Sequence, residues 1–291
     1  MKKIAFFINE YMEYFDLLKT EAEKQQVDLV FCPYSDLAMS FYKGKLVVSV
    51  KEHDLSKFDL VYFRNLDPKG EGHITVSEFC RQKQIPVLDT VFRFNLPWIA
   101  SKNFVYTRLM EKGLPLIDTE FVSESNFEQA LSRIQFPCIA KITQGAGGDG
   151  VYLCKSKEEI QQIFKKHSKH LILQNFIQND GDIRVFVIDD KVIGAMERKR
   201  VGKDEFRNNI SLGGDAIAYA LTPEMESIAV KATQALQYSV SGVDLIFDKE
   251  SLSWKIIEIN KAPQYMGIMK ATGINVPKLL IEYLQSKITS E

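Results

Sequence analysis

Apolar and polar positions alternate along the first third of the chain with two different periods. Short apolar runs predict strands, and longer stretches with apolar residues on one helical face predict the helices between them. Such alternation is typical of a small, mostly parallel α/β domain with binding loops at its strand ends. The expected strands are Lys3–Ile8, Asp28–Cys32, Leu46–Val50, Leu60–Phe63 and Pro86–Leu88, and the expected helices are Tyr11–Gln26 and Ile74–Gln84.

A domain boundary is expected near Asn95-Leu96-Pro97, where proline interrupts this pattern. Capping residues then mark the starts of the later helices. These helices are expected from Ser101 to Lys112 with Gly113 after the end, over Ser125–Ile134, from Ser156 to about His167, from Thr222-Pro223 to about Gln237, and from about Val276 to Leu284. Strands are expected at Phe121–Val122, Pro137–Ile142, Val151–Cys154, Leu171–Phe176, Ile183–Ile188 and Lys191–Glu197.

The segment Gly242–Pro263 carries the most informative polar pattern. Its two apolar runs, Val243–Asp248 and Trp254–Asn260, flank a short polar break and predict a β-hairpin. With a turn near Ser251, Asp244 is expected to lie opposite Glu258, and Asn260 points to the same side as Glu258. Two acids this close favour a cation between them, and two carboxylates with an amide suit Mg²⁺. An isolated pattern of this kind is more often a solvated hairpin face.

Four glycines in six residues separate two expected strands at Gly145–Gly150. A tight hairpin needs only one or two glycines, so four suggest that the backbone itself must approach a ligand closely. Successive backbone N–H groups without neighbouring side chains can form an anion-binding nest. A floppy hairpin is an equally good interpretation of the loop alone, and no GK[ST] motif follows it. Lys141 lies just before it in an apolar strand, where a bound phosphate would compensate its buried charge.

Three further segments are candidates on weaker signals. Gln174-Asn175-Phe176-Ile177 ends a strand at an expected hinge, and Asp182 follows it. Asp182 is suited to a ribose hydroxyl, although capping of a local turn is the better interpretation in isolation. Residues 198–214 are expected to form a polar loop whose basic side chains are mostly solvated. Within this loop, Arg207 near Asn208-Asn209 is better placed for a substrate anion.

Composition narrows the class of protein. The 291 residues carry 37 basic and 38 acidic side chains, so the overall charge gives no indication of nucleic acid or an anionic membrane as a partner. Four widely spaced cysteines, without a CxxC or Cys/His cluster, are expected to be reduced and buried. No apolar stretch reaches transmembrane length and no GxGxxG follows the first strand. A cytoplasmic protein without a dinucleotide site is expected.

The order of these features resembles the ATP-grasp superfamily, and within it the RimK-like carboxylate–amine ligases. The matching motifs run from Lys102 to about Leu284: Lys141 before the glycine-rich hairpin, QNFI, DIRVFV, FRNN with GG, LTPE, and GVDL with EINKAP. The resemblance implies an ATP-grasp fold at residues 98–177 and 178–291, preceded by a parallel-sheet domain at 1–97 that matches more loosely through YFRN at Tyr62–Asn65. Two positions depart from the pattern: Asn175 replaces a usual Glu, and Lys261 replaces a small or apolar residue. Lys261 is expected either to alter the acceptor pocket or to point outward.

The resemblance also implies roles for individual residues. Lys102, Lys141 and the loop formed by Gly145, Ala146, Gly147, Gly148 and Gly150 would contact the ATP phosphates. Adenine would bind to backbone groups of Gln174, Asn175, Phe176 and Ile177, with Asp182 near the ribose. Arg207 and Asn209 would face the transferring phosphate and the substrate, and Arg207 and Lys141 would be catalytic. Asp244, Glu258 and Asn260 would hold two Mg²⁺ ions, or Mn²⁺ in their place, with Glu258 bridging.

These features lead to an expected ATP-dependent ligase that joins a carboxylate to an amine through an acyl phosphate. An amino acid such as glutamate would be added to a peptide, a protein tail or a small carboxylate, and a homo-oligomer is compatible with this function. One alternative is a nucleotide-binding regulatory protein without turnover, against which the complete set of metal-site residues argues. Another is an ATP-grasp ligase of the dipeptide or D-alanine type. No Ser/His/Asp or Cys/His arrangement competes with this hypothesis.

Overall fold

The computed structural model describes residues 1–42, 44–94, 101–142, 150–167, 171–179, 181–199 and 216–288. The first part is built on a parallel sheet with the strand order β2-β1-β6-β7, which confirms the expected α/β domain. Its strands are β1 (Lys2–Ile8), β2 (Val27–Pro33), β6 (Leu60–Phe63) and β7 (Val87–Leu88), and its helices are α1 (Phe15–Lys24) and α2 (Gly72–Lys83). The boundary predicted at residues 95–97 lies outside the described residues.

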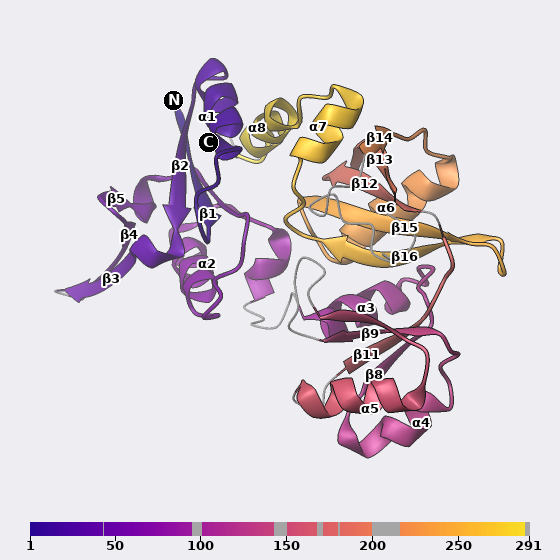
Figure 1. The fold of residues 1–291 in the computed structure, drawn as a ribbon. Coiled ribbons are helices and arrows are strands. Elements are labelled where there is room, and N and C mark those ends of the chain that lie inside the picture. Colours follow the sequence, from indigo (N-terminus) through magenta and orange to yellow (C-terminus); the bar gives the residue numbers. More distant parts are fainter. Residues whose placement is uncertain are drawn as a thin grey trace.

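A three-stranded antiparallel sheet projects from this part of the chain (Figure 1). Its strands are β3 (Leu37–Tyr42), β4 (Lys45–Val50) and β5 (His53–Asp54). Only β4 was expected. The apolar residues Leu37, Met39 and Phe41 alternate with Ala38 and Ser40, which is the pattern of a strand and would have predicted β3.

The central part is an antiparallel sheet with the order β10-β9-β11-β8, covered by helices (Figure 1). The elements are α3 (Lys102–Glu111), β8 (Thr119–Val122), α4 (Phe127–Leu131), β9 (Cys138–Ile142), β10 (Val151–Cys154), α5 (Lys157–Lys166) and β11 (Leu171–Asn175). The predicted caps of α3 are confirmed, because the Ser101 side chain accepts a hydrogen bond from the Phe104 amide and Gly113 has a φ of +64°. All four cysteines are buried and free, as expected.

The last part contains a five-stranded antiparallel sheet, ordered β14-β13-β12-β15-β16. Its elements are β12 (Gly181–Ile188), β13 (Lys191–Lys199), β14 (Ala216–Ala218), α6 (Pro223–Ala235), β15 (Val240–Asp248), β16 (Ser253–Asn260), α7 (Met266–Thr272) and α8 (Val276–Ser286). The described part of the chain has no helix that is both long and apolar enough to cross a membrane.

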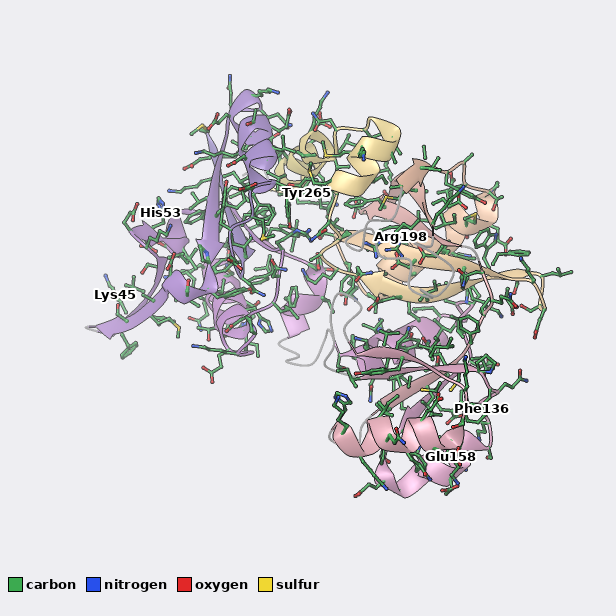
Figure 2. The ribbon with its side chains drawn as sticks, viewed as in Figure 1. Lys45, His53, Phe136, Glu158, Arg198 and Tyr265 are labelled. Carbon is green, nitrogen blue, oxygen red and sulfur yellow. The ribbon has the colours of Figure 1, made fainter. Side chains whose placement is uncertain are left out.

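The end of the chain returns to the first domain, because α8 packs against α1 (Figure 1). Leu280, Ile281 and Leu284 of α8 share a buried cluster with Phe6 and Leu18 of the first domain. Tyr265 lies at the seam between the first domain and the end of the chain (Figure 2), where its hydroxyl donates to the Tyr14 carbonyl oxygen at 2.9 Å. The division at residues 97 and 177 stays a prediction, and the buried clusters cross it.

Close packing after β16 yields the first testable prediction. A Cβ added at Gly242 would lie 2.8 Å from Cβ of Pro263, whose ring cannot move aside easily, so Gly242→Ala should reduce the free energy of unfolding by about 1–3 kcal/mol. Gly194→Ala is the matched control, because the added Cβ meets the mobile Cδ1 of Ile274 at 3.1 Å. Urea denaturation of both variants measures the difference. Equal effects of the two substitutions would contradict the packing argument.

Candidate functional site

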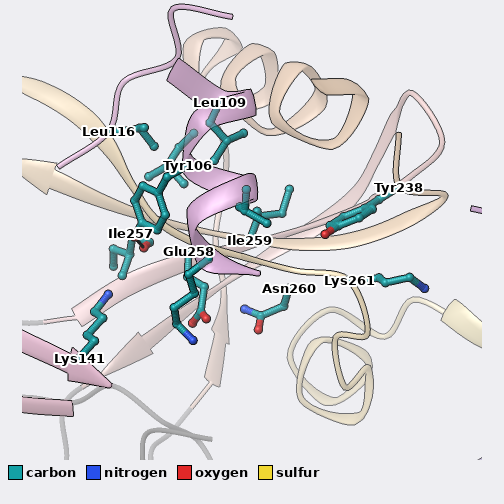
Figure 3. A pocket seen from close by; sticks show the side chains of 13 residues that line it. Tyr106, Leu109, Leu116, Lys141, Tyr238, Ile257, Glu258, Ile259, Asn260 and Lys261 are labelled. Atoms are coloured by element: carbon teal, nitrogen blue, oxygen red, sulfur yellow. Dashed lines mark hydrogen bonds between the residues drawn. The ribbon is translucent and has the colours of Figure 1, made fainter. Parts of the chain in front are cut away.

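A pocket of about 190 Å³ lies where α3, β9 and the end of β16 meet (Figure 3). Lys141 points into it from β9, and Glu258 and Asn260 point into it from β16 (Figure 3). Lys102 reaches the same pocket from the first residue of α3. Its apolar wall consists of Val105, Tyr106, Leu109, Leu116, Ile256, Ile257 and Ile259, and Tyr238 and Lys261 complete the lining.

The hairpin register confirms the predicted pairing of the two acids. Asp244 lies directly opposite Glu258, Gly242 lies opposite Asn260, and the register shifts just after Asp244. The two carboxylates nevertheless have different surroundings, since Asp244 is buried and Glu258 is exposed. Asn260 donates from Nδ2 to Asp244 Oδ2 at 3.3 Å.

Two arginines neutralise Asp244, which the sequence analysis did not anticipate. Arg184 donates from Nε to Oδ1 and from Nη2 to Oδ2, both at 2.7 Å, and Arg198 Nη2 lies 3.0 Å from Oδ2. Arg198 also donates from Nε to Oδ1 of Asp182 at 2.6 Å. Two carboxylates and two guanidinium groups therefore form a charge-balanced buried network, so the pair of acids at Asp244 and Glu258 does not depend on a metal cation alone.

This network corrects two interpretations of the sequence. Arg198 was assigned to a polar loop of mostly solvated charges, but it lies in β13 and is 4% exposed. Asp182 was assigned to a local turn, but it lies in β12 directly opposite Arg198. The sequence contained the information for this pair. Extending each strand of the predicted hairpin by one residue places Asp182 opposite Arg198. The predicted contact of Asp182 with a ribose stays a prediction.

The electrostatic environment of Asp244 is set by burial and the two arginines. Burial alone would raise its pKa, but Arg184 and Arg198 hold the pKa below its ordinary value. Burial likewise acts to lower the pKa of Arg198, and Asp244 and Asp182 raise it above the ordinary value. Both residues are therefore charged in the folded protein at neutral pH.

Lys102 and Glu258 shift the pKa of Lys141 in opposite directions. Lys141 is half-buried, and its pKa lies below the ordinary value. Burial is the main cause; Glu258 acts against the shift and Lys102 adds to it. The charges of Lys102, Lys141 and Glu258 therefore lie close enough to interact, and these three groups together carry one excess positive charge. Such an excess favours an anionic ligand. This excess of positive charge agrees with the predicted contacts of Lys102 and Lys141 with phosphate, and those contacts stay a prediction.

The strand that ends in the predicted hinge is tied to the pocket wall. Gln174 is buried and donates to the Tyr106 hydroxyl at 2.8 Å, and Tyr106 donates to the Ile257 carbonyl oxygen at 3.1 Å. Asn175 Oδ1 accepts from the Gln135 amide at 3.1 Å. The Asn175 side chain therefore joins neighbouring segments, which gives this departure from the family pattern a structural role. Phe176 and Ile177 follow β11, and their predicted adenine contacts remain untested.

Part of the predicted site lies outside the described residues. Gly150 closes the base of the glycine-rich hairpin with a φ of +77°, and its carbonyl oxygen accepts from the Ile142 amide at 2.9 Å. Its positive φ favours glycine. The predicted site residues that lie outside the described ranges are Gly145, Ala146, Gly147, Gly148, Arg207 and Asn209.

The donor set fits a hard divalent cation. Glu258, Asn260 and Asp244 offer only oxygen atoms as ligands, which is what Mg²⁺ prefers. A carboxylate has about four lone-pair sites, and those of Asp244 already face four donors, two from Arg184 and one each from Arg198 and Asn260. Asp244 would therefore exchange one of these donors for a cation. Among the described residues there is no group of three or more His, Cys, Asp and Glu positioned for a metal, so the amide of Asn260 is needed to complete the set.

The fold is that of the ATP-grasp ligases. The structure is similar to the Chryseobacterium gregarium RiPP-associated ATP-grasp ligase in complex with ADP and a leader and core peptide, with a TM-score of 0.75, 17% identity, and coverage of 99% of this chain and 98% of that chain. It is also similar to the ATP-grasp ligase PsnB complexed with minimal precursor, with a TM-score of 0.70, 15% identity and coverage of 99% of each chain. The likeness confirms the expected fold class.

Sequence comparison gives the family. The model of the RimK-like ATP-grasp domain matches residues 107–284, and the chain belongs to this family, as the resemblance implied. A probable alpha-L-glutamate ligase 1 of Shewanella frigidimarina is 37% identical over 159 residues, covering 53% of this chain and 52% of the relative. A probable alpha-L-glutamate ligase of Legionella pneumophila (strain Corby) is 36% identical over 187 residues, covering 62% and 61%. The matches thus span about half to three fifths of these relatives.

The Asp244 network leads to a prediction about acid stability. A depressed folded pKa contributes stability above the ordinary carboxyl pKa of about 3.9, and this contribution is lost as the pH falls from there through the folded value. Asp244→Asn should cost roughly 3–5 kcal/mol at pH 7, because Arg184 loses this carboxylate partner and the buried Arg198 keeps only Asp182. The variant should then lose less stability than the parent on acidification below pH ~4.

Urea unfolding at neutral and acidic pH measures both effects. Asp190→Asn is the control, because Asp190 is exposed in the β12–β13 turn and should leave both values near those of the parent. An Asp244→Asn variant that matches the parent in stability at pH 7 would contradict the network.

Proposed function

We propose that the protein is an ATP-dependent ligase that joins a carboxylate to an amine through an acyl-phosphate intermediate. The observation that carries the proposal is the convergence of Lys102, Lys141 and Glu258 at one pocket. These residues come from α3, β9 and β16, which are far apart in the sequence, so their meeting is a product of the fold. Membership of the RimK-like ATP-grasp family supports the same chemistry.

The chemistry asks for charge neutralisation and alignment more than for a nucleophilic side chain. A carboxylate oxygen of the substrate attacks the γ-phosphorus of ATP, and ADP leaves. The amine then attacks the acyl carbon, phosphate leaves with the bonding electron pair, and the amine loses a proton. Lys102 and Lys141 would neutralise the phosphate oxygens, and Arg207 would face the transferred group. Because acyl phosphates react with water, the glycine-rich loop 145–150 would serve to exclude it.

Glu258, Asn260 and Asp244 would hold Mg²⁺. The ion supplies charge neutralisation for the phosphate groups when bound. Two ions, with Glu258 bridging, are part of the proposal. Glu258 is the most accessible of the three donors, since it is exposed next to the lysines while Asp244 is engaged by Arg184 and Arg198.

An amino acid such as glutamate is proposed as the amine, and a peptide, a protein tail or a small carboxylate as the acceptor. The names of the glutamate ligase relatives support the first part, and the peptide bound to the Chryseobacterium ligase supports the second. ADP release across a panel of amino acids and carboxylates, with mass spectrometry of the products, tests the proposal. ATP binding without ADP release or a product for any pair would favour a nucleotide-binding protein without turnover.

Glu258→Gln tests the metal site. The substitution removes one charge from the pocket and keeps the shape of the side chain, so turnover should fall by several orders of magnitude, while thermal stability changes little because Glu258 is exposed. Glu250→Gln in the turn of the same hairpin is the control, since Glu250 is exposed and outside the pocket lining. Near-normal ADP release by Glu258→Gln in the presence of Mg²⁺ would remove Glu258 from the metal site.

Lys141→Met tests the phosphate contact and distinguishes it from a structural role. The burial that lowers the pKa of Lys141 makes its charge costly in the absence of a ligand, so the variant should be as stable as the parent or slightly more stable. Affinity for Mg-ATP should weaken by roughly 2–5 kcal/mol, because the bound anion loses a buried partner. Thermal melts with and without Mg-ATP, supported by titration calorimetry, measure both quantities.

Lys165→Met provides the comparison for this substitution, because Lys165 is exposed on α5 in the same part of the chain. It should keep the full nucleotide-induced stabilisation. Equal stabilisation of Lys141→Met and the parent by Mg-ATP would place Lys141 outside the nucleotide site.

A further inference from the structure

Lys261 crosses the seam between the ATP-grasp part and the N-terminal domain. It directly follows Asn260 and lines the pocket, but its side chain turns away from Glu258 (Figure 3). Its ammonium lies 3.1 Å from Oδ2 of Asp89 and donates to the carbonyl oxygen of Phe63. Of the two alternatives expected for Lys261, that it points outward is therefore wrong.

The surroundings of this ammonium are supplied by the N-terminal domain. The Tyr62 and Phe92 ring centroids lie 5.6 Å and 5.2 Å from Nζ, within range of a cation–π interaction. The Lys261 side chain is 10% exposed and that of Asp89 is 1% exposed. A charged side chain is held at such burial only when partners compensate its lost hydration.

Asp89 holds two walls of the pocket at once. Its Oδ1 accepts from the Ser239 amide at 2.7 Å, and Ser239 directly follows the pocket residue Tyr238. Oδ2 has the Lys261 ammonium 3.1 Å away as its charged partner. One buried carboxylate thus connects the start of β15 with the end of β16, at positions adjacent to pocket-lining residues.

A second bond reinforces the same connection. Arg64 follows β6, is 4% exposed, and donates from Nη2 to the Pro263 carbonyl oxygen at 2.7 Å. Pro263 in turn packs close to Gly242, opposite Asn260. The segment immediately after Asn260 is therefore anchored to the N-terminal domain at Lys261 and again at Pro263.

We infer that Asp89 and Lys261 are positioning residues, which align the Asn260 end of the pocket with the N-terminal domain for the second substrate of the ligase. The inference rests on the proposed function. Asp89 lies outside the matched region 107–284, so the N-terminal domain contributes to the geometry of the site from beyond the ATP-grasp part. Because Lys141 lies on the opposite side of the pocket from Lys261, the Asp89–Lys261 pair should govern the carboxylate or amine substrate more than ATP (Figure 3).

Steady-state kinetics of Lys261→Met and Asp89→Asn test this inference. A misplacement of about 1 Å can cost ~10²-fold in rate, so kcat/KM for the second substrate should fall by about this factor, with KM for ATP near that of the parent. Lys261→Arg keeps the charge and should retain more activity than Lys261→Met. The double variant should be no worse than either single variant, because both remove the same interaction. Equal loss toward ATP and the second substrate would overturn the inference.

Glu21→Ala is the matched control for a general loosening of the seam. Asn275 donates from Nδ2 to Glu21 Oε1 at 3.2 Å, which joins the same two parts of the chain through residues outside the pocket lining. The kcat/KM of Glu21→Ala for the second substrate should stay near that of the parent. A loss equal to that of Lys261→Met would show that seam stability alone is responsible, and would overturn the positioning role.

Hydrogen exchange keeps the inference separate from the proposed function. In Lys261→Met, amides of residues 236–242 and 258–265 should exchange faster than in the parent, while the parallel sheet of the N-terminal domain keeps its protection. Unchanged exchange in both segments would overturn the inference whether or not the parent has ligase activity. Absence of turnover in the parent, with altered exchange in the variant, would count against the proposed ligase function and support the anchoring.

Discussion

The antiparallel pairing of β15 with β16 is the constraint on which the site depends. It places Asp244 opposite Glu258 and Gly242 opposite Asn260, while the neighbouring strand β12 places Arg184 opposite Asp244. A shift of β16 by one residue would turn Glu258 and Asn260 to the other face of the sheet. The register therefore determines which carboxylate is buried among arginines and which reaches the pocket.

This arrangement separates the charges into two layers. In the buried layer, Arg184 and Arg198 balance Asp244 and Asp182, so the sheet carries its polar groups without leaving a charge uncompensated. In the pocket layer, Lys102 and Lys141 lie with Glu258, while the third lysine, Lys261, is paired with Asp89, so an excess of positive charge favours an anion. Asn260 connects the two layers, because it donates to Asp244 and also lines the pocket.

Local patterns predicted most of the fold, and they failed where distant segments decide the outcome. Ser101, Thr222 and the glycine-rich hairpin marked element ends correctly because capping and turn preferences act over a few residues. Helix α7 was missed because Tyr265 at its start provides no side-chain cap. The pairing of Lys261 with Asp89 joins residues on two domains, so no periodicity in the sequence reveals it. Arg198 was misplaced because the predicted hairpin was ended one residue pair too early.

The central claim is that the pocket activates a carboxylate by phosphorylation. It is tested most directly by supplying the acceptor identified in the product screen with its carboxylate labelled with ¹⁸O, and by measuring the label in the released phosphate by mass spectrometry. The account predicts one ¹⁸O atom in the phosphate for each amide formed, because the carboxylate oxygen that attacks the phosphorus leaves with it. Amide formation with unlabelled phosphate would contradict the acyl-phosphate route.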